Sequence, residues 1–286
     1  MTPTSHYYLS QRLRLHYMDW GNSTAPPLVL LHGARDHSRN WDGLAASLSK
    51  EWHVIAPDLR GHGDSQWSQD GHYGMEVFVY DLARLVEDQQ LAPLRLLGHS
   101  LGGNICLRYA GIYPEKVHKL VAFEGIGPSP AIIAQEAQVS IAERLQKWIA
   151  EQHDMSERAV RRYPTIEAAT QRMQQANKHL SIEQARHLTQ YGVRRNDDGT
   201  YSWKFDPHLN SLTAVDITRA QIESLWARIS CPTLMIYGKD SWASNPQEDG
   251  RLEKFPMATL AIVEQAGHWV HHDQQQKVLT LLQDFL

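Results

Sequence analysis

Short apolar runs and helix-like stripes alternate along most of the chain. The runs lie at residues 28–33, 53–58, 94–99, 117–125, 233–238 and 259–267. Continuous apolar runs of this length are typical of strands that are buried on both faces of a parallel sheet. Apolar residues at helical spacing lie between them, at 75–91, 104–113 and 274–286. Strands that alternate with helices predict an α/β fold with a doubly wound, mostly parallel sheet.

The N-terminal region has a different pattern. Residues 6–19 alternate between apolar and polar positions, with Leu13, Leu15 and Tyr17 on one side. This period of two predicts strand structure before the first buried run.

Residues 129–228 interrupt the alternation, because they contain no buried-strand run. The stripe at 132–151 predicts one amphipathic helix. Ser181 begins a capping-box pattern, and we expect its helix to end at Gly192. Asp198 and Gly199 predict a tight turn. We therefore expect a core domain of residues 1–128 and 229–286, with a helical cap of residues 129–228 inserted after the sixth strand. Ligands of open α/β sheets bind at the edge that such a cap would cover.

Three glycines surround one serine in the stretch GHSLGG at residues 98–103. A strand, the pattern G-x-S-x-G and then a helix form the arrangement called a nucleophile elbow, which exposes the serine oxygen on a strained turn. A serine hydroxyl needs a base within hydrogen-bond reach, and that base needs a group that orients it. His268 follows the last predicted strand, so we predict Ser100 as the nucleophile and His268 as the general base.

Composition narrows the class of protein. The 286 residues carry a net charge of −4 without a block of basic residues, so we expect no nucleic-acid or membrane partner. The two cysteines, Cys106 and Cys231, are far apart and favour a reducing compartment. The N-terminus has no apolar stretch typical of a signal peptide, which predicts a soluble, cytoplasmic protein. No ligand set has metal-site spacing, and we expect the adjacent pair His271 and His272 at the surface.

Four sequence motifs resemble those of the α/β-hydrolase superfamily, and the resemblance covers nearly the whole chain outside the cap. LVLLHGARD resembles the oxyanion strand and loop, and PDLRGHGDS at 57–65 resembles the loop after the fourth strand. GHSLGG matches the elbow, and AGHW matches the histidine loop. The chain is most similar to the capped branch, which contains esterases, C–C bond hydrolases, haloalkane dehalogenases and epoxide hydrolases.

The resemblance implies a role for each matching residue. Ser100 would attack a carbonyl carbon, and His268 would take its proton and later activate water. The backbone N–H groups of Ala34 and Leu101 would hold the oxyanion. The mechanism requires neither a metal nor a cofactor. His32 would brace the oxyanion loop, and Asp58 and Arg60 would hold the loop after the fourth strand.

The acid of the triad stays open between two residues. In most members it lies three or four residues after the glycine that closes the seventh strand, here Gly238, but those positions hold Ser241 and Trp242. Asp240 comes one position early. The fold offers a second position after the sixth strand, where Glu124 lies in a run that resembles some haloalkane dehalogenases with a glutamate acid. We favour Glu124 and keep Asp240 as the alternative.

The serine at the elbow also limits the chemistry. Dehalogenases and epoxide hydrolases of this fold use an aspartate there, and a serine would form an ether-like adduct that water does not cleave. We therefore predict a serine hydrolase that cleaves a small-molecule carboxylic ester through an acyl-enzyme, with Trp269 and Trp242 beside the substrate. The alternatives are a C–C hydrolase of ring-fission products, a lactonase, acyl transfer to an acceptor other than water, and a non-catalytic ligand-binding protein. The particular substrate, its acyl chain length and the oligomeric state stay open.

Overall fold

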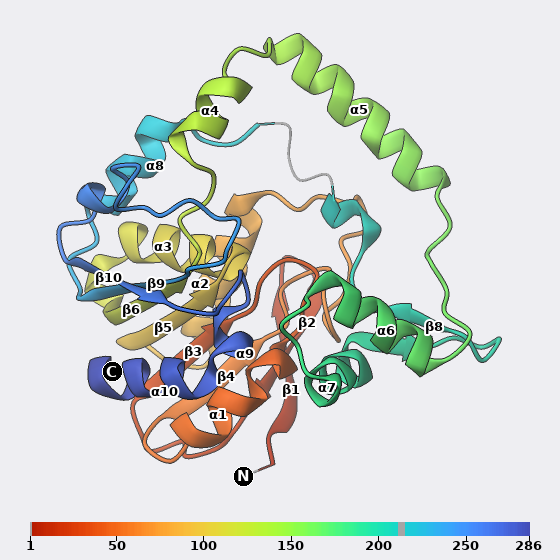
Figure 1. The fold of residues 1–286 in the computed structure, drawn as a ribbon, viewed down its shortest axis with the longest axis horizontal. Coiled ribbons are helices and arrows are strands. Elements are labelled where there is room, and N and C mark those ends of the chain that lie inside the picture. The colour runs from red at the N-terminus through yellow and green to blue at the C-terminus, as the bar shows by residue number, and fades with distance from the viewer. Residues whose placement is uncertain (1, 211–214) are drawn as a thin grey trace.

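A computed structural model describes residues 2–210 and 215–286, and its centre is an eight-stranded sheet (Figure 1). The strands are β1 (Thr4–Ser10), β2 (Leu13–Asp19), β3 (Pro27–Leu31), β4 (His53–Pro57), β5 (Leu94–His99), β6 (Val117–Phe123), β9 (Thr233–Gly238) and β10 (Ala258–Val263). Their spatial order is β1-β2-β4-β3-β5-β6-β9-β10. The pairs β1–β2 and β2–β4 are antiparallel, and every other pair in this sheet is parallel. The predicted α/β fold with a mostly parallel sheet is confirmed.

The strand periodicity over 6–19 is confirmed, and this stretch forms two strands, the antiparallel hairpin of β1 and β2. Gln11 and Arg12 form its two-residue turn with φ of 46° and 68°. Two positive φ values suit the twist of a hairpin, but such turns usually carry Gly, Asn or Asp. Neither residue gives that signal, so the alternating pattern continued through the turn.

Helices cover both faces of the sheet (Figure 1). One face carries α1 (Asp42–Leu48), α9 (Val270–Asp273) and α10 (Gln275–Phe285), and the other carries α2 (Met75–Asp88), α3 (Leu101–Ile112) and α8 (Arg219–Trp226). Successive residues of β3 enter opposite cores: Leu28 and Leu30 join the first, and Val29 and Leu31 join the second. This two-sided burial explains why the sheet strands read as continuous apolar runs. Short 3-10 helices lie at Ser38–Trp41, Pro114–Lys116, Pro207–Asn210 and Leu252–Lys254.

The region between β6 and β9 contains α4 (Pro130–Glu136), α5 (Ile141–Glu157), α6 (Ile166–Ala176), α7 (Ile182–Gly192) and a hairpin of β7 (Val193–Arg195) and β8 (Tyr201–Trp203). The Ser181 capping box and the helix end at Gly192 are confirmed. Gly199 lies in the predicted turn with a φ of 83°. The expected single helix at 132–151 is two helices, because Ser140 forms a capping box with Glu143 and begins α5.

Two parts of this region relate differently to the sheet. In Figure 1, α5 stands away from the sheet, and its side chains Ile141, Leu145 and Ile149 are exposed. In contrast, α8 packs against α3, and Trp226 is fully buried in the core. The expected cap range 129–228 thus includes one helix that packs as part of the core. Among the described residues, no helix is long and apolar enough to cross a membrane.

Candidate active site

Ser100 occupies a sharp turn between β5 and α3. Its φ of 52° and ψ of −113° lie in a region that non-glycine residues rarely adopt. Its N–H donates to the carbonyl oxygen of Phe123 at 2.8 Å, and its carbonyl oxygen accepts from the N–H of Asn104 at 3.0 Å. These bonds hold the strained backbone from both sides. Such strain persists only where the surrounding structure over-determines it, and it is common at functional sites.

Close backbone approach explains the glycines on either side of Ser100. A Cβ atom at Gly98 would lie 2.4 Å from the carbonyl oxygen of Gly102. A Cβ atom at Gly102 would lie 2.3 Å from the carbonyl oxygen of Leu31 in β3. Both separations are impossible for real carbon and oxygen atoms, so the turn accepts only glycine at these positions. The elbow motif is therefore a packing requirement of β3, β5 and α3.

His268 and Glu124 form a buried pair. His268 Nδ1–H donates to Glu124 Oε2 at 2.5 Å, and the two side chains are 8% and 0% exposed. Glu124 Oε1 accepts from the N–H of Gly238 at 2.8 Å, and Oε2 also accepts from Ser241 Oγ at 2.6 Å. Three donors thus satisfy a carboxylate that has no access to water. Because Nδ1 carries the proton, Nε2 of His268 is left as the basic nitrogen.

Asp240, the alternative acid, makes no hydrogen bond to His268. Its side chain is exposed, and within the described residues its carboxylate accepts no hydrogen bond. Its backbone N–H donates to the carbonyl oxygen of Ala266 at 2.9 Å, which fixes the start of the loop after β9. The next residue, Ser241, reaches Glu124 instead. The structure therefore brings Glu124 to His268 and leaves Asp240 in solvent.

The loop after β3 lies directly against the elbow. A Cβ atom at Gly33 would lie 2.7 Å from His99 Nδ1 and 3.3 Å from the Cβ atom of Ser100. Ala34, Ser100 and Leu101 line one cavity of about 470 Å³. Within the described residues, the backbone N–H groups of Ala34 and Leu101 have no hydrogen-bond acceptor. Both expected oxyanion donors are thus free for a ligand beside Ser100.

His32 braces this loop. Its Nε2 accepts from the N–H of Leu59 at 3.0 Å, and its Nδ1–H donates to the carbonyl oxygen of Gly33 at 2.7 Å. The two bonds fix one tautomer and tie the loop after β3 to the loop after β4. Burial lowers the pKa of His32, so the ring is neutral at pH 7. Its two nitrogens are fully occupied, which leaves it no role as a second base.

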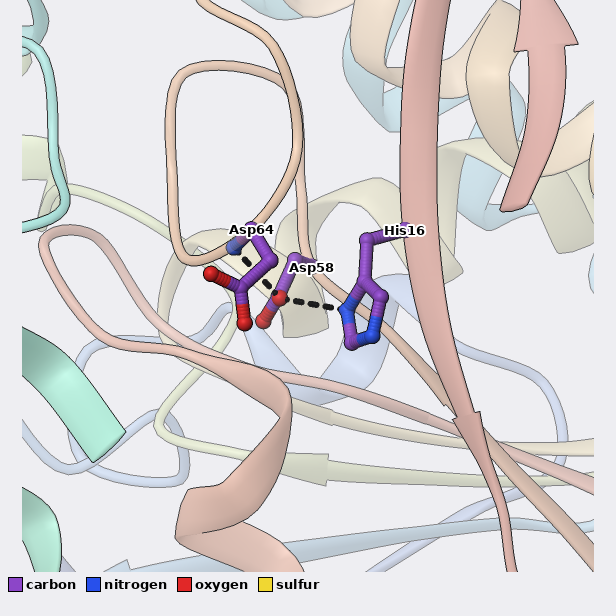
Figure 2. A group of neighbouring side chains, drawn as sticks. All are labelled: His16, Asp58 and Asp64. Atoms are coloured by element: carbon purple, nitrogen blue, oxygen red, sulfur yellow. Dashed lines mark hydrogen bonds and ion pairs between the residues drawn. The ribbon is translucent and has the colours of Figure 1, made fainter. Parts of the chain in front are cut away.

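Asp58 is the centre of a group with His16 and Asp64 (Figure 2). Its carboxylate accepts from His16 Nδ1–H at 2.7 Å, from the N–H of Asp64 at 2.9 Å and from the N–H of Ser38 at 2.6 Å. Burial opposes its charge, but these donors lower the pKa of Asp58 well below its usual value. Protein donors occupy both oxygens of Asp58, so the role of the group is structural: it stabilises the loop after β4.

Arg60 stabilises the same loop from the other side. Its Nε and Nη2 donate to the two carboxylate oxygens of Asp81 at 2.6 and 2.7 Å, and both side chains are 3% exposed. This buried, bidentate pair connects the loop to α2. Neither Arg60 nor Asp58 lines the cavity beside Ser100.

The two expected tryptophans lie on different sides of Ala34. Trp242 lines the cavity with Ser100, and its ring centroid is 4.6 Å from that of His268. Trp242 is nevertheless 77% exposed, so it forms the rim of the cavity. Trp269 lines a second cavity of about 200 Å³, together with Trp203 and Phe205, and Ala34 borders both cavities. Trp242 and Trp269 therefore line two separate cavities that both border on Ala34.

The sequence analysis did not predict that His99 and His271 are buried. His99 Nε2–H donates to the carbonyl oxygen of His268 at 2.9 Å, with ring centroids 4.7 Å apart. His271, which was expected at the surface, is only 2% exposed and stacks on Trp41 at 4.6 Å. Burial lowers the pKa of both His99 and His271 well below 6.5, and His99 holds the backbone of His268 through its bond to the carbonyl oxygen. The burial of His271 could not be predicted from the sequence, because a histidine in a short helix carries no burial signal.

Comparisons with known proteins agree with this geometry. Residues 26–153 match the family described as "alpha/beta hydrolase fold". A serine hydrolase-like protein of Danio rerio is 28% identical over 93% of this chain and 83% of its own length. An esterase of Mycobacterium tuberculosis is 27% identical over 93% of this chain and 84% of its own. The thioesterase domain of the curacin biosynthetic pathway shares the fold with a TM-score of 0.86, at 23% identity over 99% of this chain and 100% of its own.

The chain has the α/β-hydrolase fold. Its relatives include proteins named esterases, such as one of Escherichia coli K12 that is 26% identical over 91% of this chain and 92% of its own. The protein is therefore a hydrolase of this fold, as its motifs predicted.

Proposed function

We propose that this protein is a serine hydrolase that cleaves a small-molecule carboxylic ester through an acyl-enzyme intermediate. The observation that carries the proposal is the buried bond between His268 and Glu124, because Glu124 lines the same cavity as the serine on the strained elbow. The relatives named esterases support the ester as the substrate class. Every residue that the reaction needs comes from the core sheet and its adjoining loops.

In the first half-reaction, Ser100 Oγ attacks the carbonyl carbon while its proton passes to His268 Nε2. Nε2 is the accepting nitrogen because Nδ1–H is already donated to Glu124. The carbonyl oxygen becomes an oxyanion and accepts from the N–H groups of Ala34 and Leu101. When the tetrahedral intermediate collapses, His268 returns the proton to the leaving alkoxide oxygen, and the acyl group stays on Ser100.

In the second half-reaction, water replaces the alcohol. His268 Nε2 takes one proton of the water as its oxygen attacks the acyl carbon. Collapse of the second intermediate releases the carboxylic acid and returns the proton to Ser100 Oγ. In each half, Glu124 holds the imidazole tautomer and stabilises the imidazolium that forms. Since Glu124 is fully buried, its charge acts in a medium that screens it weakly.

The cavity lining favours an apolar acyl group. Met75, Leu101, Ile132 and Tyr237 contribute to its wall, and the described lining contains no lysine. A volume of about 470 Å³ is within the range of small-molecule sites, which indicates an acyl chain of moderate size.

A turnover screen tests the proposal. One preparation is given p-nitrophenyl esters of increasing acyl length, lactones and a dienone ring-fission product. We expect hydrolysis of the esters, and its loss in Ser100→Ala. A protein that cleaves only lactones or only the dienone would instead be a lactonase or a C–C hydrolase. Activity that persists in Ser100→Ala would contradict the acyl-enzyme.

A further inference from the structure

One buried arginine lies in the wall of the active-site cavity. Arg108 is on α3, two turns beyond Ser100, and its side chain is 8% exposed. It lines the same cavity as Ser100, together with Asn104 and Asp216. Arginines are seldom buried to this extent without a partner of opposite charge. The mechanism above gives Arg108 no role.

The guanidinium of Arg108 is engaged on both sides. Its Nε donates to Asn104 Oδ1 at 2.9 Å. Its Nη1 donates to Asp216 Oδ1 at 2.9 Å, and its Nη2 donates to Asp216 Oδ2. This parallel, two-point arrangement is the one by which arginine recognises carboxylates in general. Asp216 thus occupies the position on Arg108 where the carboxylate of a ligand would bind.

The positive charge of Arg108 is therefore neutralised within the cavity. The charged residues in its described lining are Arg108, Asp216 and Glu124. Glu124 is bound to His268, and Arg108 and Asp216 neutralise each other. Asp216 is 34% exposed and lies on the segment that leads into α8, far from Arg108 in the sequence. An anionic ligand would have to displace this carboxylate and leave it beside a second negative charge.

We propose that the Arg108–Asp216 pair determines the charge selectivity of the acyl pocket. Asp216 blocks the carboxylate-binding face of Arg108, so the enzyme accepts uncharged acyl groups and rejects acyl groups that end in a carboxylate. Removal of the charge of Asp216 leaves Arg108 as an unpaired cation in the pocket, and the selectivity then shifts toward acyl groups that end in a carboxylate. The inference rests on the proposed ester hydrolysis, and it names the residues that select the substrate of that site.

The test compares two esters of similar length, p-nitrophenyl valerate and mono-p-nitrophenyl glutarate, in wild type and Asp216→Asn. We expect wild type to prefer the valerate in kcat/KM. In Asp216→Asn, the ratio of glutarate to valerate kcat/KM should rise about 10- to 100-fold, the range for a charged hydrogen bond. The gain should come mainly from a lower KM for the glutarate ester. Free glutarate should inhibit valerate hydrolysis by Asp216→Asn and not by wild type.

Two further variants serve as controls. Glu223→Gln removes a carboxylate from α8 that pairs with Arg219 and does not line the cavity, so it should leave the ratio unchanged. The double variant Arg108→Met/Asp216→Asn should cleave the valerate and gain nothing on the glutarate, because the cation is absent. Thermal melting checks that each variant is folded.

The possible results separate this inference from the proposed function. If wild type cleaves neither ester nor any other ester of the screen, the proposed function fails. If wild type cleaves the valerate but Asp216→Asn keeps the wild-type ratio, only the selectivity inference fails. A wild type that prefers the glutarate ester also overturns the inference, whether or not Asp216→Asn folds, because the substrate then displaces Asp216.

Discussion

Ser241 Oγ donates to the same carboxylate oxygen of Glu124 that accepts from His268 Nδ1, at 2.6 Å and 2.5 Å. Ser241 stands where most α/β hydrolases, by the resemblance noted above, carry the acid of the triad. In this chain the serine at that position supports a glutamate that comes from the end of β6. The acid, Glu124, and the residue at the usual position of the acid, Ser241, thus lie together at the site and are joined by a hydrogen bond.

The first prediction concerns the identity of the acid. Glu124→Gln should lower kcat on the order of 10⁴-fold, the loss seen when the orienting carboxylate of a triad becomes an amide. Asp240→Asn should stay within about tenfold of wild type, because its carboxylate is exposed and makes no bond to His268. Steady-state kinetics on one ester, with circular dichroism to verify folding, gives the comparison. A collapse of activity in Asp240→Asn alone would refute the assignment of Glu124.

The second prediction uses Ser241 to move the acid. In the double variant Glu124→Gln/Ser241→Asp, a carboxylate at 241 lies close to the place that Glu124 Oε2 occupied, because Ser241 Oγ is 2.6 Å from that atom. We expect the double variant to recover on the order of 10²-fold in kcat over Glu124→Gln, a partial return of the orienting charge. The single variant Ser241→Asp is the control and should lose activity, since it places two carboxylates together. No recovery in the double variant would show that position 241 does not face His268.

The third prediction concerns stability at low pH. His62 is fully buried, and burial lowers the pKa of its ring to about 3. In the unfolded chain a histidine protonates near pH ~6.5, so below that pH the unfolded state binds more protons than the folded state. His62 therefore destabilises the fold progressively as pH falls, by about 2 kcal/mol between pH ~7 and pH ~5.

Urea unfolding of His62→Gln measures this contribution. The variant should lose about 2 kcal/mol less than wild type between pH ~7 and pH ~5, whatever its stability at pH ~7. His118→Gln removes an exposed histidine and should keep the wild-type pH dependence. If the unfolding free energies of His62→Gln and wild type changed equally with pH, His62 would protonate as readily in the folded protein as in the unfolded chain, and the prediction would be wrong.

Local patterns were sufficient to predict the sheet and the elbow. The runs at 94–99 and 233–238 coincide with β5 and β9, because strands buried on both faces consist of continuous apolar residues. Ser100 and its glycines were recognisable because a close approach of two backbones restricts the sequence at those positions. Features of this kind depend on residues that are adjacent in the chain.

Contacts between distant segments could not be predicted. The bonds of Glu124 to Ser241 and of Arg108 to Asp216 join segments that the fold alone brings together. The burial of His271 likewise depends on Trp41 and His99, which come from other elements. The split of the helix at 132–151 was readable in principle, because Ser140 and Glu143 form a capping box, but the apolar stripe continued through it.

The central claim is that His268 and Glu124 activate Ser100, and covalent labelling tests it most directly. A fluorophosphonate forms a stable adduct with an activated serine, and peptide mass mapping locates the adduct. We predict one adduct per chain, at Ser100, with labelling slowed on the order of 10²-fold or more in His268→Gln, since that variant lacks the general base. An unmodified Ser100 in folded wild-type protein, with the label on another residue or absent, would contradict the account.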